Sequence, residues 1–143
     1  MHDQQPYEAQ ISVRWSDIDA LGHLANSKYL EYASHVRFQF LRSRGVDETA
    51  GCGAVVLSET IAYRKEIRPG STVTITLHLG AARRDGSRYE LRQEIRNDHQ
   101  VAATLTATGA WLALEERRLV VPPSPTAAAL FSMPRSNDFR WLD

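Results

Sequence analysis

The residues best suited to chemistry lie in one short segment, Trp15–Tyr32, which runs into a predicted helix. It holds two aspartates, Asp17 and Asp19, and a histidine, His23. The start of a helix carries free backbone N–H groups and the positive end of the helix dipole, so developing negative charge is stabilised there. A carboxylate held nearby could attack a carbonyl carbon, or could deprotonate a water that attacks it. This arrangement indicates acyl transfer through an anionic tetrahedral intermediate.

Ordinary structural roles explain the same residue types. Asp, Asn and Ser before a helix are common capping residues, and Gly22 could serve only to permit a turn. His23 could be a structural histidine that donates to a backbone carbonyl or to Asp19. On the helix, Tyr29 could be a core residue and Arg37 could form a surface or interface ion pair. From the residues alone, both interpretations stay open.

The elements beside this segment follow from the hydrophobic pattern. Apolar and polar residues alternate over Tyr7–Trp15, which predicts a half-buried strand. Beyond the loop, apolar residues recur every three to four positions, which predicts a helix over 27–44. Asn26 or Ser27 is expected as its N-cap, and Gly45 can take the left-handed conformation that ends it.

The rest of the chain predicts four more strands and a tail. The expected strands cover 54–67, 72–79, 88–96 and 101–114, joined by short turns such as Pro69–Gly70 and Asp85–Gly86. A short helix is expected after Ser124, through Ala127 to Phe131, with Pro134 as its limit, and the segment after Pro134 is expected to be loosely held. One strand, one long helix and four strands predict an α+β fold. In it, an antiparallel sheet of about five strands wraps around the central helix.

Composition limits the function classes. The length fits a single domain, residues 1–143, with a C-terminal tail from about residue 122. Seventeen basic and 17 acidic residues balance, so no global charge favours nucleic acid or an anionic membrane as partner. No apolar stretch approaches the roughly 18 residues of a membrane span, so we expect a cytoplasmic protein. The predominance of Arg over Lys is typical of a GC-rich bacterial genome. Cys52 stands alone and the histidines lack ligand spacing, so no metal site is predicted.

The segment before the helix resembles the signature of the 4-hydroxybenzoyl-CoA thioesterase family of hot-dog proteins, approximately Asp-x-Asp-x-x-Gly-His-x-Asn-Asn-x-x-Tyr-Leu. The matching residues are Asp17, Asp19, Gly22, His23, Asn26, Tyr29 and Leu30. Two positions depart: Ala25 replaces the first Asn of the usual pair, and Ser34 stands where an acidic residue is common. The expected order of elements agrees with the hot-dog fold. Tyr63 followed by Pro69–Gly70 resembles the family's usual strand and turn.

The resemblance implies hydrolysis of an acyl-CoA thioester to the free acid and coenzyme A, with no cofactor beyond the coenzyme A of the substrate. It makes Asp19 the nucleophile or general base and Asp17 a supporting residue. It places the backbone N–H of Asn26 against the thioester oxygen. His23 would orient the loop or a water, and Tyr29 would line the acyl pocket.

Binding of an acyl-CoA would also require cations near its phosphates. The candidates are Arg64, Lys65, Arg83, Arg84 and Arg88, each of which could instead be solvated surface charge. Because the predicted sheet leaves edge strands and a mildly polar face uncovered, a homodimer or homotetramer is expected, with any pocket shared between subunits.

Two other function classes compete with hydrolysis. The spacing of Asp19 and His23 superficially suits a hot-dog hydratase or dehydratase, but the Asn-Pro-x-His-x-Asp segment usual for that chemistry is absent. A non-catalytic module that binds acyl thioesters is the third interpretation, and a pure binder has no need of Asp19. The sequence does not distinguish coenzyme A from an acyl carrier protein, and it does not specify the acyl group.

Overall fold

The structure of the chain is a computed structural model that describes residues 4–143. Its elements are β1 (Tyr7–Ser12), α1 (Asn26–Ser43), β2 (Cys52–Tyr63), β3 (Thr72–Ala82), β4 (Arg88–Asn97), β5 (Gln100–Ala113), β6 (Leu119–Val120), α2 (Ser124–Phe131) and β7 (Arg135–Trp141). Short 3₁₀ turns precede α1 and β2. Among the described residues, no helix is long and apolar enough to cross a membrane.

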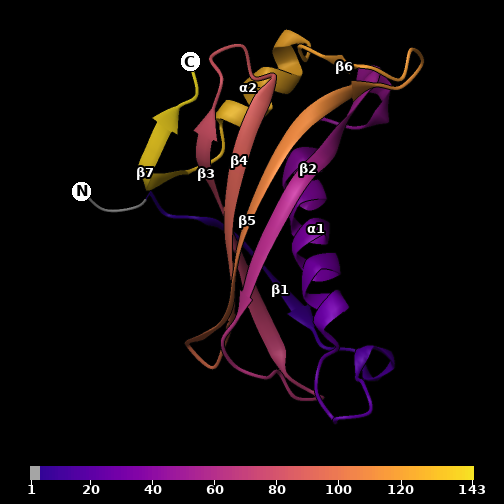
Figure 1. Cartoon of the computed structure of the whole chain (residues 1–143), viewed down its shortest axis with the longest axis vertical. Coiled ribbons are helices and arrows are strands. Elements are labelled where there is room, and N and C mark those ends of the chain that lie inside the picture. Colours follow the sequence, from indigo (N-terminus) through magenta and orange to yellow (C-terminus); the bar gives the residue numbers. More distant parts are fainter. Residues whose placement is uncertain (1–3) are drawn as a thin grey trace.

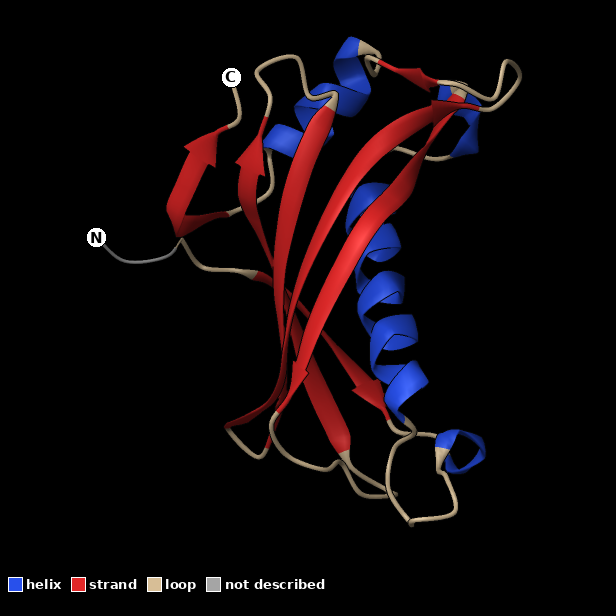
Figure 2. Ribbon diagram, in the orientation of Figure 1, coloured by secondary structure: helices blue, strands red, loops and turns tan. Residues whose placement is uncertain are grey.

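The sheet and α1 form two layers. The strand order is β1-β3-β4-β5-β2, and each of these neighbours pairs antiparallel. Buried and half-exposed residues alternate along β4, so alternate side chains face the core. The long helix lies along one face of the curved sheet (Figure 1), and the second helix closes its upper end (Figure 2). The predicted α+β hot-dog architecture is therefore confirmed.

The core consists of two apolar clusters with a polar layer between them. We call the end of the molecule that holds residues 13–25 the lower end, which is at the bottom of Figure 1. The lower cluster includes Tyr29, Ile75, Ile95 and Leu105, and the upper cluster includes Phe40, Leu91, Tyr89, Trp111 and Met133. Between Leu91 and Ile95 on β4 stands Gln93, which bonds to Arg37 of α1. The two halves of α1 therefore pack on separate cores.

Two expected strands end earlier than their hydrophobic pattern suggests. The first ends at Ser12, because Trp15 begins a 3₁₀ turn and is 75% exposed. The second ends at Tyr63, after which the N–H groups of Arg64 and Lys65 both donate to the carbonyl of Ala102. After the first strand, the N–H of Val13 donates to the carbonyl of Ser71, just before β3; after the second, two successive N–H groups share one carbonyl of β5, so the regular ladder stops there.

The C-terminal tail departs most from expectation. The short helix expected after Ser124 is present as α2, Ser124–Phe131, but the segment after Pro134 is not loosely held. It forms β7, which pairs parallel with β3 at Leu79 and Ala82. Since β1 reaches only as far as Leu77 on that strand, β7 occupies the part of the edge that β1 leaves unpaired.

Candidate active site

The segment between β1 and α1 folds into a small hairpin over residues 17–25. The carbonyl of Asp17 accepts the N–H of Ala25 at 3.0 Å, and the N–H of Asp19 donates to the carbonyl of His23 at 3.0 Å. The hairpin therefore fixes Asp19 opposite His23, directly ahead of the first turn of α1.

The tip of the hairpin holds the Asp19 side chain. Its carboxylate oxygen Oδ1 accepts the N–H of Leu21 at 2.9 Å, and its carbonyl accepts the N–H of Gly22 at 3.0 Å. Gly22 has φ +85°, a conformation that costs a residue with a side chain about 1–2 kcal/mol. Below the tip, the N–H of Leu24 donates to the carbonyl of Ile67 at 2.8 Å, which attaches the hairpin to the segment after β2.

Asp17 is buried and fully engaged. Its Oδ2 atom accepts the Tyr32 hydroxyl at 2.6 Å and Nε of Arg14 at 3.0 Å, and the Lys28 ammonium lies 3.8 Å from Oδ1. The hydrogen bond from Tyr32, with the one from Arg14, holds the pKa of this carboxyl below its ordinary value. These contacts tie the start of the hairpin to α1, which suits the supporting role expected of Asp17.

Asp19 is the exposed member of the pair. Its side chain is 32% exposed, and its Oδ2 atom lies 3.8 Å from Nδ1 of His23. The same ring nitrogen lies 3.3 Å from the carbonyl of Leu24. A proton on Nδ1 would thus face both acceptors, which orients the imidazole beside Asp19, whose carboxylate remains partly exposed.

The first turn of α1 has no side-chain cap. The expectation that Asn26 or Ser27 is the N-cap is wrong: Ala25 holds that position in an extended conformation and makes no side-chain cap hydrogen bond. The hydrogen bond from the Ala25 N–H to the Asp17 carbonyl holds Ala25 in the hairpin, so Asn26 becomes the first helical residue. The N–H groups of Asn26 and Ser27 have no acceptor within the helix and remain available as donors.

Two tyrosines pack edge to face beside this turn, and the outer one was not expected at the site. Tyr29 is 2% exposed, its hydroxyl donates to the carbonyl of Lys65 at 3.3 Å, and burial raises its pKa. Tyr63 packs edge-on against it at 5.0 Å between ring centroids and donates its hydroxyl to the carbonyl of Asn26 at 3.1 Å. Tyr63 is 44% exposed. Tyr29 is a core residue in this chain, and Tyr63 is the aromatic that faces outward; its position at the end of β2 was the available signal.

The five candidate cations fall into two groups. Arg64 and Lys65 follow β2 at the lower end and are exposed, with the Lys65 ammonium donating to Oε1 of Gln100 at 2.7 Å. They share this end with Asp19, so both could approach a ligand held there.

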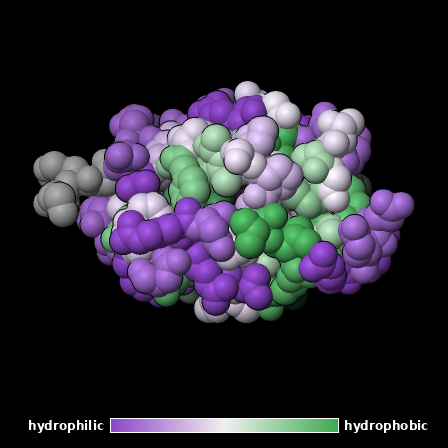
Figure 3. Space-filling model, turned by 90° about the horizontal axis from the view of Figure 1, so that it is seen from above, coloured by the Kyte–Doolittle hydropathy of each residue, from purple (hydrophilic) through white to green (hydrophobic). Residues whose placement is uncertain are grey.

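Arg83, Arg84 and Arg88 lie on the β3–β4 hairpin at the upper end, so one chain does not bring them to the same end as Asp19 (Figure 1). A groove of about 370 Å³ joins Arg83 and Arg88 with Arg140. Arg84 turns away and lies 4.6 Å from the centre of the Trp141 ring. Seen from above, this end shows hydrophobic surface beside hydrophilic side chains (Figure 3).

The remaining titratable candidates show no reactive setting. The Cys52 thiol is buried, and burial raises its pKa. Among residues 4–143, no cluster of three or more His, Cys, Asp or Glu side chains could hold a metal ion.

Comparison with known families places this hairpin and helix in context. The model of the Thioesterase-like superfamily matches residues 13–130, which include the hairpin, α1 and all of the main strands except β1. The chain belongs to this superfamily.

Solved structures give the same fold. The PA2801 protein of Pseudomonas aeruginosa is 28% identical, with a TM-score of 0.77 over 88% of this chain and 99% of its own. The 1,4-dihydroxy-2-naphthoyl-CoA thioesterase Slr0204 of Synechocystis is 16% identical, with a TM-score of 0.77 over 89% of this chain and 96% of its own. The Staphylococcus aureus protein SAV2348, in complex with CoA, is 20% identical, with a TM-score of 0.80 over 92% of this chain and 85% of its own.

Proposed function

We propose that this thioesterase-like protein hydrolyses acyl-CoA thioesters, with Asp19 as nucleophile or general base. The observation that carries the proposal is the contrast within the hairpin. Asp17 is buried and engaged by Tyr32 and Arg14, whereas Asp19 keeps a partly exposed carboxylate in the hairpin that leads into a helix start without a side-chain cap. A reactive carboxylate needs that freedom, and a merely structural one does not.

The reaction balances in either role of Asp19. As general base, the carboxylate takes a proton from water while the water oxygen bonds to the thioester carbon. As nucleophile, it forms an acyl anhydride that water then hydrolyses. In both cases the N–H of Asn26 stabilises the oxyanion, the carbon–sulfur bond breaks, and the thiolate leaves and takes up a proton. His23 keeps the carboxylate and a water in place.

A second copy of the chain would complete the site. β2 lies at the edge of the sheet with Val56 and Leu57 each 49% exposed, and its unpaired edge offers backbone groups that a second copy can pair with. A two-fold pairing of β2 with its copy is antiparallel, so it would set the Tyr63 end of one strand near the Cys52 end of the other. The upper end of the partner would then approach Asp19.

This pairing also offers a use for the separated cations. Arg83 and Arg88 of a second copy would reach the end at which Asp19 and Arg64 lie. Two cations in one groove suit the phosphates of coenzyme A. The CoA bound to the Staphylococcus aureus protein makes coenzyme A the carrier to test first, ahead of an acyl carrier protein.

The decisive experiment follows thiol release from a panel of aliphatic and aryl acyl-CoA thioesters. We expect hydrolysis of some members, with kcat falling at least a hundredfold in Asp19→Asn, since a general base alone contributes about 10²–10⁴. Asn keeps the oxygen that accepts the Leu21 N–H, so the hairpin should survive. Asp98→Asn is the matched control: it removes an exposed carboxylate at a positive-φ turn position that Asn tolerates.

The other function classes are outcomes of the same assay. Binding of acyl-CoA without thiol release would point to a binding module. Consumption of an enoyl-CoA without thiol release would point to a hydratase. Thiol release that does not change in Asp19→Asn would contradict the proposed mechanism.

A further inference from the structure

A groove runs between β1 and α1, on the side of the helix away from β2. It measures about 560 Å³, which lies within the range of roughly 300–1,000 Å³ usual for binding sites. The strand side of the groove is formed by Gln10, Ile11, Ser12 and Arg14, and the helix side by Glu31, Tyr32, Ser34, His35 and Phe38. The groove is therefore large enough for a ligand and combines polar, charged and apolar side chains.

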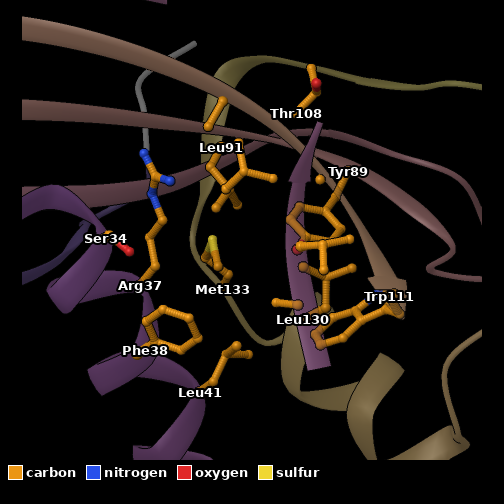
Figure 4. A pocket seen from close by; sticks show the side chains of 15 residues that line it. Ser34, Arg37, Phe38, Leu41, Tyr89, Leu91, Thr108, Trp111, Leu130 and Met133 are labelled. Atoms are coloured by element: carbon orange, nitrogen blue, oxygen red, sulfur yellow. The ribbon is translucent and has the colours of Figure 1, made fainter. Parts of the chain in front are cut away.

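A second, smaller cavity lies on the other side of α1 and belongs to a different part of the molecule. It measures about 60 Å³ and opens toward β2, and its lining includes the buried Arg37 together with Tyr89 and Trp111 (Figure 4). Pairing of β2 with a second copy would cover its mouth. β1 lies at the opposite end of the strand order from β2, so that pairing does not use the groove at β1.

The backbone of β1 has a free edge. In an antiparallel pair, every second residue bonds to the partner strand and the residues between them point their N–H and C=O groups away from it. The N–H of Val13 donates to the carbonyl of Ser71 at 2.9 Å, and the same register continues along β1 and β3. Glu8, Gln10 and Ser12 therefore point their backbone groups away from β3. In the described part of the chain, no other strand pairs with β1.

This free edge faces the groove. The N–H of Arg14, the next residue in the same series, donates to the Tyr32 hydroxyl of α1 at 3.3 Å, which shows that this side of the strand points toward the helix. Gln10 and Ser12 line the groove in front of it. A row of backbone donors and acceptors beside a helix is matched by an extended peptide, which adds a strand to the edge. A small acid or an acyl chain has no such row of groups.

The charge of the peptide follows from Arg14 at the lower end of the groove. Its side chain is 64% exposed, and its Nε donates to Asp17 at 3.0 Å. Its two Nη atoms have no carboxylate partner in the described part of the chain, and such a pair can hold a carboxylate through two hydrogen bonds. Glu31, the acidic residue of the groove, is already engaged by the Lys28 ammonium at 2.7 Å. We propose that this groove binds an extended peptide segment of a partner protein, which pairs with β1 and places an acidic side chain at Arg14.

A partner protein suits this edge better than a second copy of the chain. Copies that pair through β2 at one edge of the sheet and through β1 at the other would join into an open, growing sheet rather than a closed assembly. A short segment of another protein ends the sheet at β1. The proposal does not rest on thioester hydrolysis, because neither the groove nor the strand edge contains Asp19 or His23.

The test titrates the full chain with synthetic peptides and follows its backbone amides by NMR. The probes are acetylated hexapeptide amides of alternating Thr and Val, in which one Asp replaces each residue in turn, and the same set with Asn in place of Asp. We expect at least one Asp peptide to bind saturably and to shift the amide protons of Gln10 and Ser12, which gain a partner, more than those of Ala9 and Ile11. Its Kd should be at least about threefold lower than that of its Asn counterpart, as for an exposed ion pair.

Two changes at one position test the backbone pairing. Gln10→Pro removes an N–H that points away from β3, which an edge strand tolerates, whereas Gln10→Ala removes the side chain and keeps the N–H. We expect the Kd of the peptide to rise roughly fivefold or more in Gln10→Pro and to change less than twofold in Gln10→Ala. In Arg14→Gln, the Asp and Asn peptides should bind equally, because the guanidinium that distinguishes them is gone.

Several outcomes would overturn the proposal. Failure of every Asp peptide to bind saturably would do so, as would equal peptide affinity of Gln10→Pro and Gln10→Ala. Saturable binding of hexanoate with the same amide shifts would assign the groove to small carboxylic acids. Shifts of the Gln10 and Ser12 amides with protein concentration alone would assign the edge to a second copy. Should Gln10→Pro not fold, the amide shifts of the wild-type chain decide, and a peptide that leaves Gln10 and Ser12 unchanged would contradict strand addition.

Discussion

The two ends of α1 are built on different principles. At the N-terminal end, hydrogen bonds hold a short hairpin that leaves Asp19 partly exposed and leads into a first helical turn without a side-chain cap. At the C-terminal end, large apolar side chains such as Trp111 and Leu130 are almost completely buried, and the residues that line a small cavity beside them include the buried Arg37. The lower end has polar and titratable groups held by hydrogen bonds, and the upper end has a closely packed apolar core.

The polar layer of Arg37 and Gln93 makes this division possible. Gln93 bonds both to the backbone of α1 and to Arg37, so the layer ties helix to sheet between the two apolar clusters. The hydrogen bonds at the lower end position the side chains of the hairpin. Their loss should therefore lower kcat more than it lowers the free energy of unfolding. Apolar packing at the upper end stabilises the fold. Its loss should lower the free energy of unfolding more than it lowers kcat.

The largest loss of stability is expected from Trp111→Ala at the upper end. Trp111 is 1% exposed, packs against Tyr89 at 5.5 Å between ring centroids and donates its indole N–H to the carbonyl of Gly86 at 2.9 Å. Truncation of a buried aromatic residue to Ala costs about 3–5 kcal/mol, which urea unfolding would measure. Leu119→Ala, at a position 41% exposed, should stay within about 0.5 kcal/mol. Equal losses of unfolding free energy in the two variants would contradict the view that buried packing dominates the stability of this end.

A smaller loss, dependent on pH, is expected from Asp17→Asn at the lower end. The pKa of Asp17 is lowered from 3.8, chiefly by the Tyr32 hydroxyl, so its ionised form contributes stability above that pH. The contribution disappears as the pH falls through the lowered pKa. Urea midpoints at pH 7 should therefore separate wild type from Asp17→Asn, and the gap should narrow below pH 3.8.

Tyr32→Phe should act in the same direction, because it removes the largest cause of that shift. Other carboxyls with lowered pKa values, Asp47, Asp85 and Asp138, also weaken the protein in acid. They do so equally in both proteins and cancel in the comparison. A gap that stays constant from pH 7 to pH 3 would show that Asp17 contributes nothing through its charge.

Two glycines allow an effect on the position of Asp19 to be distinguished from an effect on stability. Gly22 in the hairpin and Gly45 after α1 have φ +85° and +80°, and a Cβ at either would meet open space. Each change to Ala should cost about 1–2 kcal/mol of unfolding free energy for the same backbone reason. Only Gly22→Ala should also lower kcat, because it moves the turn that holds Asp19. Equal effects of both variants on kcat would show that the conformation of the hairpin does not affect the reaction.

Local patterns in the sequence predicted most of the fold. The helix was expected over 27–44 and is found over Asn26–Ser43, and the turn at Pro69–Gly70 is present with Gly70 at φ +79°. These features depend on neighbouring residues. β7 forms because a short β1 leaves part of the β3 edge unpaired. The residues after Pro134 contain no pattern that predicts pairing with a strand so distant in the sequence.

The candidate site was predictable in its residues and less so in its arrangement. The motif spacing picked out Asp17, Asp19 and His23, which the hairpin brings together. The same reasoning did not show that Asp17 would be buried by Tyr32, since that contact spans fifteen residues. Nor could it place Arg37 beside a cavity. Helical spacing predicts the face of the helix on which a residue lies, but not which residues of the sheet pack against that face.

The smallest expected effect is that of Tyr63→Phe, which alters one hydrogen bond at the junction of β2 and α1. The lost bond to the carbonyl of Asn26 lies at an exposed position, so the unfolding free energy should change by at most about 0.5–1 kcal/mol. The ring remains packed on Tyr29, so the wall of the site stays in place. If the first turn of α1 supplies the oxyanion donor, its looser anchoring should lower kcat several-fold and leave KM nearly unchanged. A change in KM alone would assign Tyr63 to substrate binding, and the division of labour between the two ends of α1 would have to be redrawn.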